Sequence, residues 1–253
     1  MTFLKYRKAF ALVSVFLLVL FHPAPAFAEE EYNRFLSLYD GLLQDYVRPA
    51  KENGISFNGV DYDSWAKDAR HKQALSLITA APPQSDKMDY WINLYNFLTI
   101  DLIVREGERE NIRNLGGFFR NPWKRHKWEI AGRDYTLHEI EHEILRPMGD
   151  ARIHFAINCA ALSCPDLRDE VYRAEKLDLQ LDEQTRLTLN NNSKGLRRDG
   201  NTVFLSKVMD WFREDYNDGD LVSWLNPYLE PPLDTNTRTR FLPYDWSLNN
   251  AAP

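Results

Sequence analysis

The chain has little cysteine, no excess of positive charge and no internal repeat. Its 253 residues include two cysteines, and its formal net charge is −6. Nucleic acids and anionic lipids attract clustered Lys and Arg, so an acidic chain without such clusters is not expected to bind either. Predicted strands are short and non-consecutive, without a βαβ rhythm. This pattern favours a single α+β domain with helices packed around a small, mostly antiparallel sheet.

The one long apolar run lies near the N-terminus and is typical of a secretory signal. Lys5, Arg7 and Lys8 precede a mostly apolar run over 9–21, and a small-x-small cleavage site ends at Ala28. We expect cleavage there to leave one globular domain over 29–253, periplasmic or secreted and without a membrane span. Because three basic residues are lost, the net charge moves from −6 to about −9.

Hydrophobic periodicity and capping residues predict the secondary structure. Helices are expected over 31–48, from Asp61 or Asp63 to about 80, over 86–105 with Ser85 before it, and over 137–145, 207–216 and 221–229. A polar helix or an irregular arm is expected over about 174–190. Strands are expected over 55–57, 152–158 and 203–205, with a hairpin over 127–137. In the irregular segment 107–126, large apolar groups are expected to rim a pocket: Phe118, Phe119 and Trp123.

The predicted helix 86–105 is apolar around nearly its whole circumference, which is typical of a central helix. It carries two amides, Asn93 and Asn96, three positions apart and therefore on one side. Buried amides must find hydrogen-bond partners. These two side chains either bond a neighbouring loop, or they bind substrate or orient a catalytic imidazole.

Both cysteines lie in the segment 152–168, which opens as a predicted strand and breaks into a loop at Pro165. Five residues of helix rise roughly 7.5 Å, too far for a disulfide, so a Cys159–Cys164 bridge requires a loop between them. The spacing is not that of a Cys-x-x-Cys redox motif.

Three states of the cysteines are open on this basis. Export to an oxidising compartment favours a disulfide. A reactive thiol, Cys159 or Cys164, would need a base, for which His142 and His154 are equal candidates. Two inert buried thiols are the third state.

Residues 138–142 match the H-E-x-x-H pattern, in which two imidazoles on one helix face hold zinc. Here His138 and His142 would be ligands, Glu139 the general base, and His154 a possible third ligand. A plainer account also exists, because Thr136 and Glu139 have the spacing of a capping box. No metal or other cofactor is required by the remaining sequence.

Several motifs together resemble the domain of unknown function 547 family. The motifs are Tyr90-Trp-Ile-Asn-Leu-Tyr-Asn-Phe-Leu-Thr-Ile100, Ile140-Glu-His-Glu-Ile-Leu-Arg146, Arg152-Ile-His-Phe-Ala-Ile-Asn-Cys159, Ser163-Cys-Pro165 and Tyr244-Asp-Trp246. The resemblance covers about residues 80–215, with the last motif outside.

The resemblance implies an exported bacterial protein and favours thiol chemistry, since some eukaryotic relatives join this domain to glutaredoxin-like modules. Plant relatives carry it at the end of longer coiled-coil chains. The family usually has an acidic residue where His138 stands, which weakens the zinc hypothesis. The family pattern is matched here at Asn93, Asn96, Glu141, His142, His154, Cys159 and Cys164.

Three functions follow as hypotheses, each for an unidentified small molecule or peptide. The first is a thiol-dependent hydrolase or acyltransferase whose pocket lies between the 86–105 helix and the 152–168 segment. Its catalytic residues would be Cys159 or Cys164 with His142 or His154, and Asn93, Asn96 and Glu141 would bind substrate. The second is a non-catalytic binding module with a Cys159–Cys164 disulfide. The third is a zinc hydrolase using His138 and His142.

Overall fold

Helix α4 (Met88–Glu106) lies at the centre of the fold, and every residue from Asp89 to Ile103 is buried. A computed structural model describes residues 25–84, 86–117 and 121–251. The apolar circumference of α4 explains its position, because such a helix is stable only with protein on all sides. The central helix is therefore confirmed. Its predicted opening residue Ser85, like Phe118 and Phe119 and residues 1–24 of the predicted signal, lies outside the described residues.

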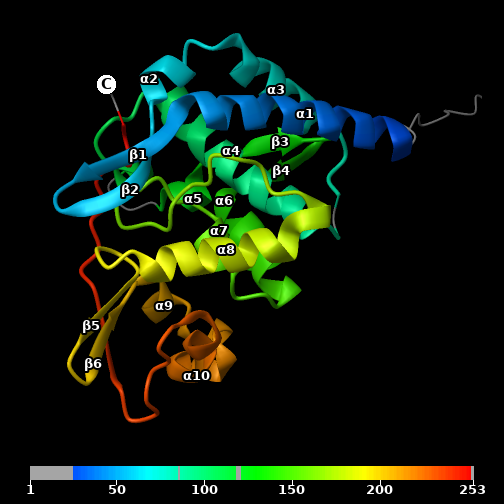
Figure 1. The fold of residues 1–253 in the computed structure, drawn as a ribbon. Coiled ribbons are helices and arrows are strands. Elements are labelled where there is room, and N and C mark those ends of the chain that lie inside the picture. The colour runs from blue at the N-terminus through cyan, green and yellow to red at the C-terminus, as the bar shows by residue number, and fades with distance from the viewer. Residues whose placement is uncertain (1–24, 85, 118–120, 252–253) are drawn as a thin grey trace, which may run out of the picture.

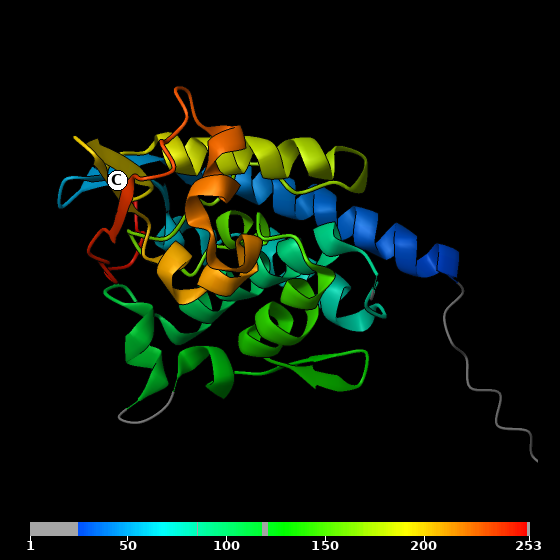
Figure 2. The ribbon, with the colours of Figure 1, turned by 90° about the horizontal axis from the view of Figure 1, so that it is seen from below.

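Two long helices run across one face of the domain (Figure 1), α1 (Pro25–Tyr46) and α8 (Leu177–Asn190). Viewed from below, both lie on the side opposite to the hairpin of β3 (Trp128–Ile130) and β4 (Arg133–Tyr135) (Figure 2). Aromatic side chains join α1 to the central helix: the rings of Phe35 and Phe97 meet edge to face at 5.2 Å.

The single helix predicted from residue 61 to 80 is instead two helices, α2 (Tyr62–Trp65) and α3 (Ala69–Ala80). Asp61 caps the first and Asp68 caps the second, because each carboxylate accepts a backbone N–H of the first turn. The second cap breaks the continuous helix that the periodicity predicted.

The strands form three small sheets. The first pairs β1 (Val47–Glu52) with β2 (Ile55–Val60), and the second pairs β3 (Trp128–Ile130) with β4 (Arg133–Tyr135), both antiparallel. The third has the order β5 (Leu196–Asp199), β6 (Thr202–Leu205), β7 (Arg238–Phe241), in which β6 and β7 are parallel. The α+β class is confirmed, although β1, β5 and β7 were not predicted.

The predicted strand over 152–158 is wrong, because this stretch contains the one-turn helix α7 (Ile153–Ala156). Asp150 starts the turn by accepting the backbone N–H of Arg152 at 2.9 Å and binding its guanidinium. All residues from 153 to 158 are buried, so the run has no exposed face to set its periodicity. A short apolar run of this kind does not distinguish strand from buried helix.

The remaining helical elements are short. They are the 3-10 turns η1 (Ile112–Gly116), η3 (Arg146–Met148), η4 (Ala174–Lys176), η5 (Arg213–Asp215), η6 (Asn217–Gly219) and η7 (Asn226–Tyr228), the α-helices α5 (Pro122–Arg125), α6 (Leu137–Glu139), α9 (Val208–Trp211) and α10 (Leu221–Leu225), and the π-helix η2 (Ile140–Leu145). The helices predicted over 207–216 and 221–229 are thus divided into single turns.

Buried apolar side chains form two clusters. The larger surrounds α4, and the smaller joins α9, α10 and the β5–β7 sheet around Phe155. The C-terminal segment then returns to the first sheet (Figure 1), where Asn250 bridges to Val60. Within the described part of the chain, no helix combines the length and apolar character needed to cross a bilayer.

Candidate functional site

A pocket of about 190 Å³ lies between the two apolar clusters. Its walls come from α4, η2, the segment 154–165, α9 and the C-terminal tail. The lining residues are Tyr95, Asn121, Trp123, His138, Glu141, His142, His154, Ile157, Cys159, Cys164, Pro165, Val208, Trp211, Phe212, Tyr244 and Trp246. Both cysteines, Glu141, His142 and His154 therefore converge on one cavity, and its remaining walls are mostly aromatic.

The loop that carries the cysteines is fastened at both ends by Asn158. Its side-chain oxygen accepts the N–H of Ala160 at 2.8 Å, and its amide donates to the carbonyl of Pro165 at 2.7 Å. Ala160 has φ 59°, a left-handed conformation that is unusual for alanine. This loop turns Cys159 and Cys164 toward each other, as a bridge between them requires.

The side chain of Asn96 anchors the start of the same loop from α4. Its oxygen accepts the N–H of Asn158 at 2.8 Å, and its amide donates to the carbonyl of Ala156 at 3.0 Å. Asn93 makes the equivalent pair of bonds to the N–H and carbonyl of Tyr172. Neither amide is among the residues that line the pocket, and both bond neighbouring backbone; substrate binding by Asn93 and Asn96 stays a prediction.

The two sulfurs are in direct contact. Cys159 Sγ lies 2.7 Å from Cys164 Sγ, and both thiols are free. This separation is longer than the 2.03–2.05 Å of a disulfide bond, but the sulfurs need only a small approach to form one. Cys159 is partly exposed to the pocket, whereas Cys164 is buried.

The surroundings of the sulfurs favour a thiolate on Cys164. Burial alone would raise its pKa, but Cys159 donates to Cys164 Sγ from its own thiol and from its backbone N–H at 2.9 Å, and the charge of Lys194 acts in the same direction; the net pKa is lowered. Burial and the neighbouring sulfur raise the pKa of Cys159. The Tyr244 hydroxyl lies 3.0 Å from Cys159 Sγ. Of the two thiol protons, the one on Cys159 is therefore held more firmly than the one on Cys164.

Glu141 lies on the same pocket wall as the cysteines and is otherwise enclosed by protein. Burial raises its pKa to about 7, while a hydrogen bond from the Tyr95 hydroxyl at 3.1 Å and the charge of Arg146 oppose the rise. Its charge in turn contributes to the raised pKa of Cys159. A carboxyl group that titrates near neutrality is suited to accept and return a proton. Glu141 stands on the π-helix η2, a conformation often found at functional sites.

His142 is held as a neutral imidazole. Burial lowers its pKa to about 4, with further contributions from His138 and Arg146. Arg146 donates to Nδ1 at 3.1 Å, and because a guanidinium only donates, the imidazole proton is placed on Nε2. The His138 and His142 rings lie 4.2 Å apart.

His154 forms a buried pair with Asp215. Its Nε2 donates to the Asp215 carboxylate at 2.7 Å, and its ring stacks on Phe212 at 4.0 Å. Burial lowers the pKa of His154 to about 4, although the bond to Asp215 opposes this. Nδ1 is left as an acceptor without a hydrogen-bond partner among the described residues. The carboxylate of Asp215 is held in turn by two bonds from Arg146 at 2.7 Å.

None of the described hydrogen bonds joins an imidazole to a sulfur. The partners of the sulfurs are each other, the Cys159 N–H and Tyr244, whereas His142 bonds Arg146 and His154 bonds Asp215. The Cys–His pair that a thiol hydrolase requires is thus absent from this arrangement of the described residues.

The H-E-x-x-H residues have a structural role at the start of α6. Thr136 accepts the backbone N–H of Glu139 at 3.1 Å, as an N-cap does, while the Glu139 carboxylate bonds Arg133, so the N-cap half of the predicted capping box is observed. Glu139 does not line the pocket. Among residues 25–84, 86–117 and 121–251, no group of three or more His, Cys, Asp or Glu side chains is placed to hold a metal ion.

Several residues of the site were not identified from the sequence. Asp215, Lys194 and Tyr95 act through bonds or charges that join distant parts of the chain. Tyr244 belongs to the aromatic motif 244–246, whose resemblance to the family was the one signal that pointed to it.

Comparison of the sequence with protein-family models gives a match. Residues 80–187 match the model of the family described as Protein of unknown function, DUF547. The match supports the resemblance seen in the motifs, spans less than half of the 253 residues, and ends before residue 215, where the motifs had suggested. Comparisons with curated proteins and with solved structures found no match. The matched segment supplies the cysteines, Glu141 and all three pocket histidines, whereas Asp215, Tyr244 and Trp246 lie beyond it.

Proposed function

We propose that this protein exchanges electrons between the Cys159–Cys164 dithiol and a disulfide-containing compound bound in the pocket. The observation that carries this proposal is that two free cysteines place their sulfurs side by side in the wall of a cavity. The loop that holds them is fastened by Asn158 and Asn96, so the dithiol is preorganised for ring closure.

The reaction proceeds by two displacements. The Cys164 thiolate attacks a substrate disulfide RSSR, forming a mixed disulfide and releasing RS⁻. Cys159 then loses its proton and attacks Cys164 Sγ, which forms the Cys159–Cys164 disulfide and releases the second RS⁻. The protein loses two electrons and the one proton of Cys159, and RSSR gains the two electrons to become two RS⁻ thiolates, which then take up protons from water. The reverse sequence transfers a disulfide from the protein to a substrate dithiol.

Glu141 is the proton acceptor for the second displacement. The thiol of Cys159 has a raised pKa, so its deprotonation limits that step unless a base is near. Glu141 lines the same pocket and has a pKa of about 7, which matches a group that takes up and returns a proton at neutral pH.

A thiol-dependent hydrolase or acyltransferase is the second candidate. It is favoured by one observation, that Cys159, His142 and His154 line one pocket and that His154 Nδ1 has no hydrogen-bond partner in the part of the chain that the structure describes. It requires an imidazole to move onto a sulfur. A binding module with a permanent disulfide has less support, because Cys159 and Cys164 are free thiols. A zinc hydrolase has less support, because no third ligand is placed beside His138 and His142 among the described residues.

A glutathione titration tests the first candidate. Purified protein is equilibrated at pH 7 with mixtures of reduced and oxidised glutathione, quenched with acid, and weighed intact. We expect a reversible loss of about 2 Da in the wild type. Cys159→Ser and Cys164→Ser should each instead trap a glutathione adduct, and the double serine variant is the control. Two thiols that remain free in every mixture contradict the proposal.

The second candidate has a separate readout. A burst of acyl transfer from an activated ester, with the acyl group on one cysteine and loss of the burst in His142→Ala, would support a hydrolase. An exchange enzyme should show the mass loss without this dependence on His142.

We also propose export, on the basis of the N-terminal sequence. Cleavage after Ala28 would leave Glu29 as the first residue. N-terminal sequencing of the mature protein tests it, and an intact N-terminus in the cytoplasmic fraction contradicts it.

A further inference from the structure

A lysine is buried beside the dithiol loop. Lys194 stands between α8 and β5, and its side chain is 2 % exposed. The ammonium donates to the carbonyl of Leu162 at 3.2 Å and to the carboxylate of Asp166 at 2.6 Å. These partners lie two positions before and two positions after Cys164, so the positive charge stands beside Cys164.

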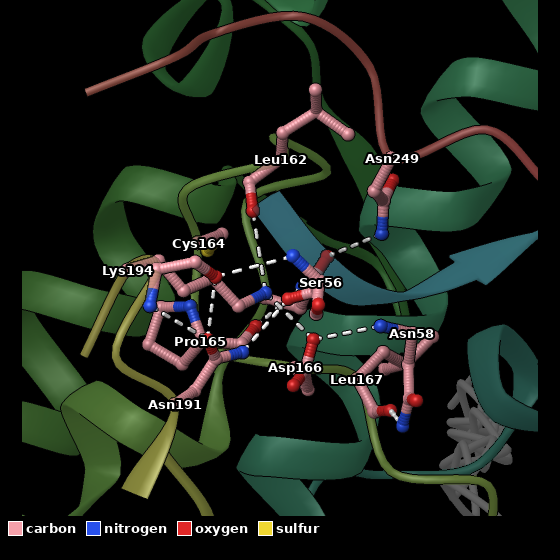
Figure 3. A network of polar contacts seen from close by, with 12 residues as sticks. Ser56, Asn58, Leu162, Cys164, Pro165, Asp166, Leu167, Asn191, Lys194 and Asn249 are labelled. Carbon is pink, nitrogen blue, oxygen red and sulfur yellow. Dashed lines mark hydrogen bonds and ion pairs between the residues drawn. The ribbon is translucent and has the colours of Figure 1, made fainter. Parts of the chain in front are cut away.

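The carboxylate of Asp166 is held in place by two hydrogen-bond donors. Its Oδ1 accepts both the Lys194 ammonium and the backbone N–H of Asn58 on β2 at 2.7 Å. Figure 3 shows Lys194 and Asp166 within one polar network that extends to Asn58, with Cys164 drawn beside it. Burying an ammonium is costly, and one carboxylate at 21 % exposure is its only ion-pair partner among the described residues. A function for the charge would explain why this position is not apolar.

We propose that Lys194 is a positioning residue that stabilises the thiolate of Cys164 and thereby sets the dithiol–disulfide equilibrium of the pocket, while Asp166 limits its effect. This inference rests on the proposed exchange function. A positive charge near a sulfur favours the thiolate, and a negative charge disfavours it. The lowered pKa of Cys164, to which Lys194 contributes, agrees with this arrangement.

The charge has a defined effect on the redox equilibrium. Stabilising the thiolate stabilises the reduced protein, which makes its disulfide a stronger oxidant. Lys194 should therefore favour the dithiol, and its loss should favour the disulfide. Other ionisable groups that face the two sulfurs stay unchanged in the variants below: Tyr62, Tyr95, Glu141 and Tyr244.

Two opposite substitutions separate electrostatics from structure. Lys194→Gln removes the positive charge, and Asp166→Asn removes the negative one. We expect the fraction of thiolate at pH 7, followed by ultraviolet absorbance, to fall about tenfold in the first and to rise in the second. The equilibrium constant with glutathione should move toward the disulfide in the first and toward the dithiol in the second, by a smaller factor than the thiolate fraction, because only the population ionised at pH 7 contributes. Lys194→Arg keeps the charge and should restore the wild-type values.

A fourth variant protects the test from misfolding. Lys194→Gln leaves Asp166 partly buried and unpaired, so Lys194→Gln with Asp166→Asn removes both charges and should fold. Its thiolate fraction should be lower than that of Asp166→Asn alone. Thiolate fractions that shift with the same sign in both single variants, or that do not shift, would overturn the inference. Such a result is expected if Lys194 and Asp166 only hold the loop in place, because either substitution then loosens the loop. Opposite thiolate shifts without any disulfide formation would uphold the electrostatic role and reject the exchange function.

Discussion

Replacing Glu141 with glutamine should stabilise the folded protein at neutral and alkaline pH. Glutamine has nearly the same shape as the protonated carboxyl group, and its oxygen still accepts the Tyr95 hydroxyl. The folded protein holds the Glu141 proton up to a pKa of about 7, against an ordinary value of 4.5. Between these values the folded state binds more protons than the unfolded state, so this group makes stability fall as pH rises.

The magnitude follows from the difference between the two pKa values. A difference of about 2.5 corresponds to about 3 kcal/mol, the cost of keeping the ionised group in its folded site above pH 7. Because one side of Glu141 meets pocket water, this figure is an upper value. The gain from glutamine should be near zero at pH 4, grow between pH 4.5 and 7, and stay constant above.

Urea unfolding of both proteins at pH 4, 5, 6, 7 and 8 measures this difference. Glu143→Gln is the matched control, since Glu143 is exposed on the same π-helix. The same Glu141 variant should also slow closure of the dithiol, because an amide accepts no proton from Cys159. A stability difference that does not change with pH, or a loss of stability at pH 8, would refute the reasoning.

Three further substitutions test the supports of the site. Asn96→Ala should lower the free energy of unfolding by about 2–4 kcal/mol, because a buried N–H and a buried carbonyl lose their partners; urea unfolding measures this, and a loss under 1 kcal/mol contradicts it. His154→Gln should cost up to about 3 kcal/mol more at pH 7 than at pH 4. The folded pKa of His154 is lowered from 6.5 to about 4, so the unfolded state binds more protons in this window and the contribution is lost as pH falls. An equal cost at both pH values argues against a neutral buried imidazole. Gly195→Ala should destabilise by about 2–4 kcal/mol, because its new Cβ would lie 1.6 Å from the carbonyl oxygen of Thr188; unchanged thermal unfolding would contradict this packing.

Local sequence signals predicted those parts of the fold that depend on neighbouring residues. The apolar circumference of α4 predicted its central position, and Ala131-Gly132 predicted the hairpin, where both residues have positive φ. Thr136 was identified as a cap and accepts the N–H of Glu139. In each case the deciding interactions lie within a few positions of the chain.

The parts that were missed depend on tertiary contacts. The run 153–157 is apolar because it is buried on every side, and its helical turn is started by Asp150, outside the run. Asp215 bonds His154 from a distant part of the chain, and no local sequence pattern predicts a site residue at its position. The clustering of cysteines and histidines in the sequence did indicate which segment forms the pocket, but not that the sulfurs would meet each other instead of an imidazole.

The position of the pocket has a consequence for biosynthesis. Tyr244 and Trp246 complete its wall, whereas Cys159 emerges from the ribosome more than eighty residues earlier. Until the later segment docks, the two thiols lack their aromatic cover and are open to any oxidant or foreign thiol in their surroundings. A nascent or truncated chain is thus the form in which these cysteines are least selective, and a folding factor that shields them would act during that interval.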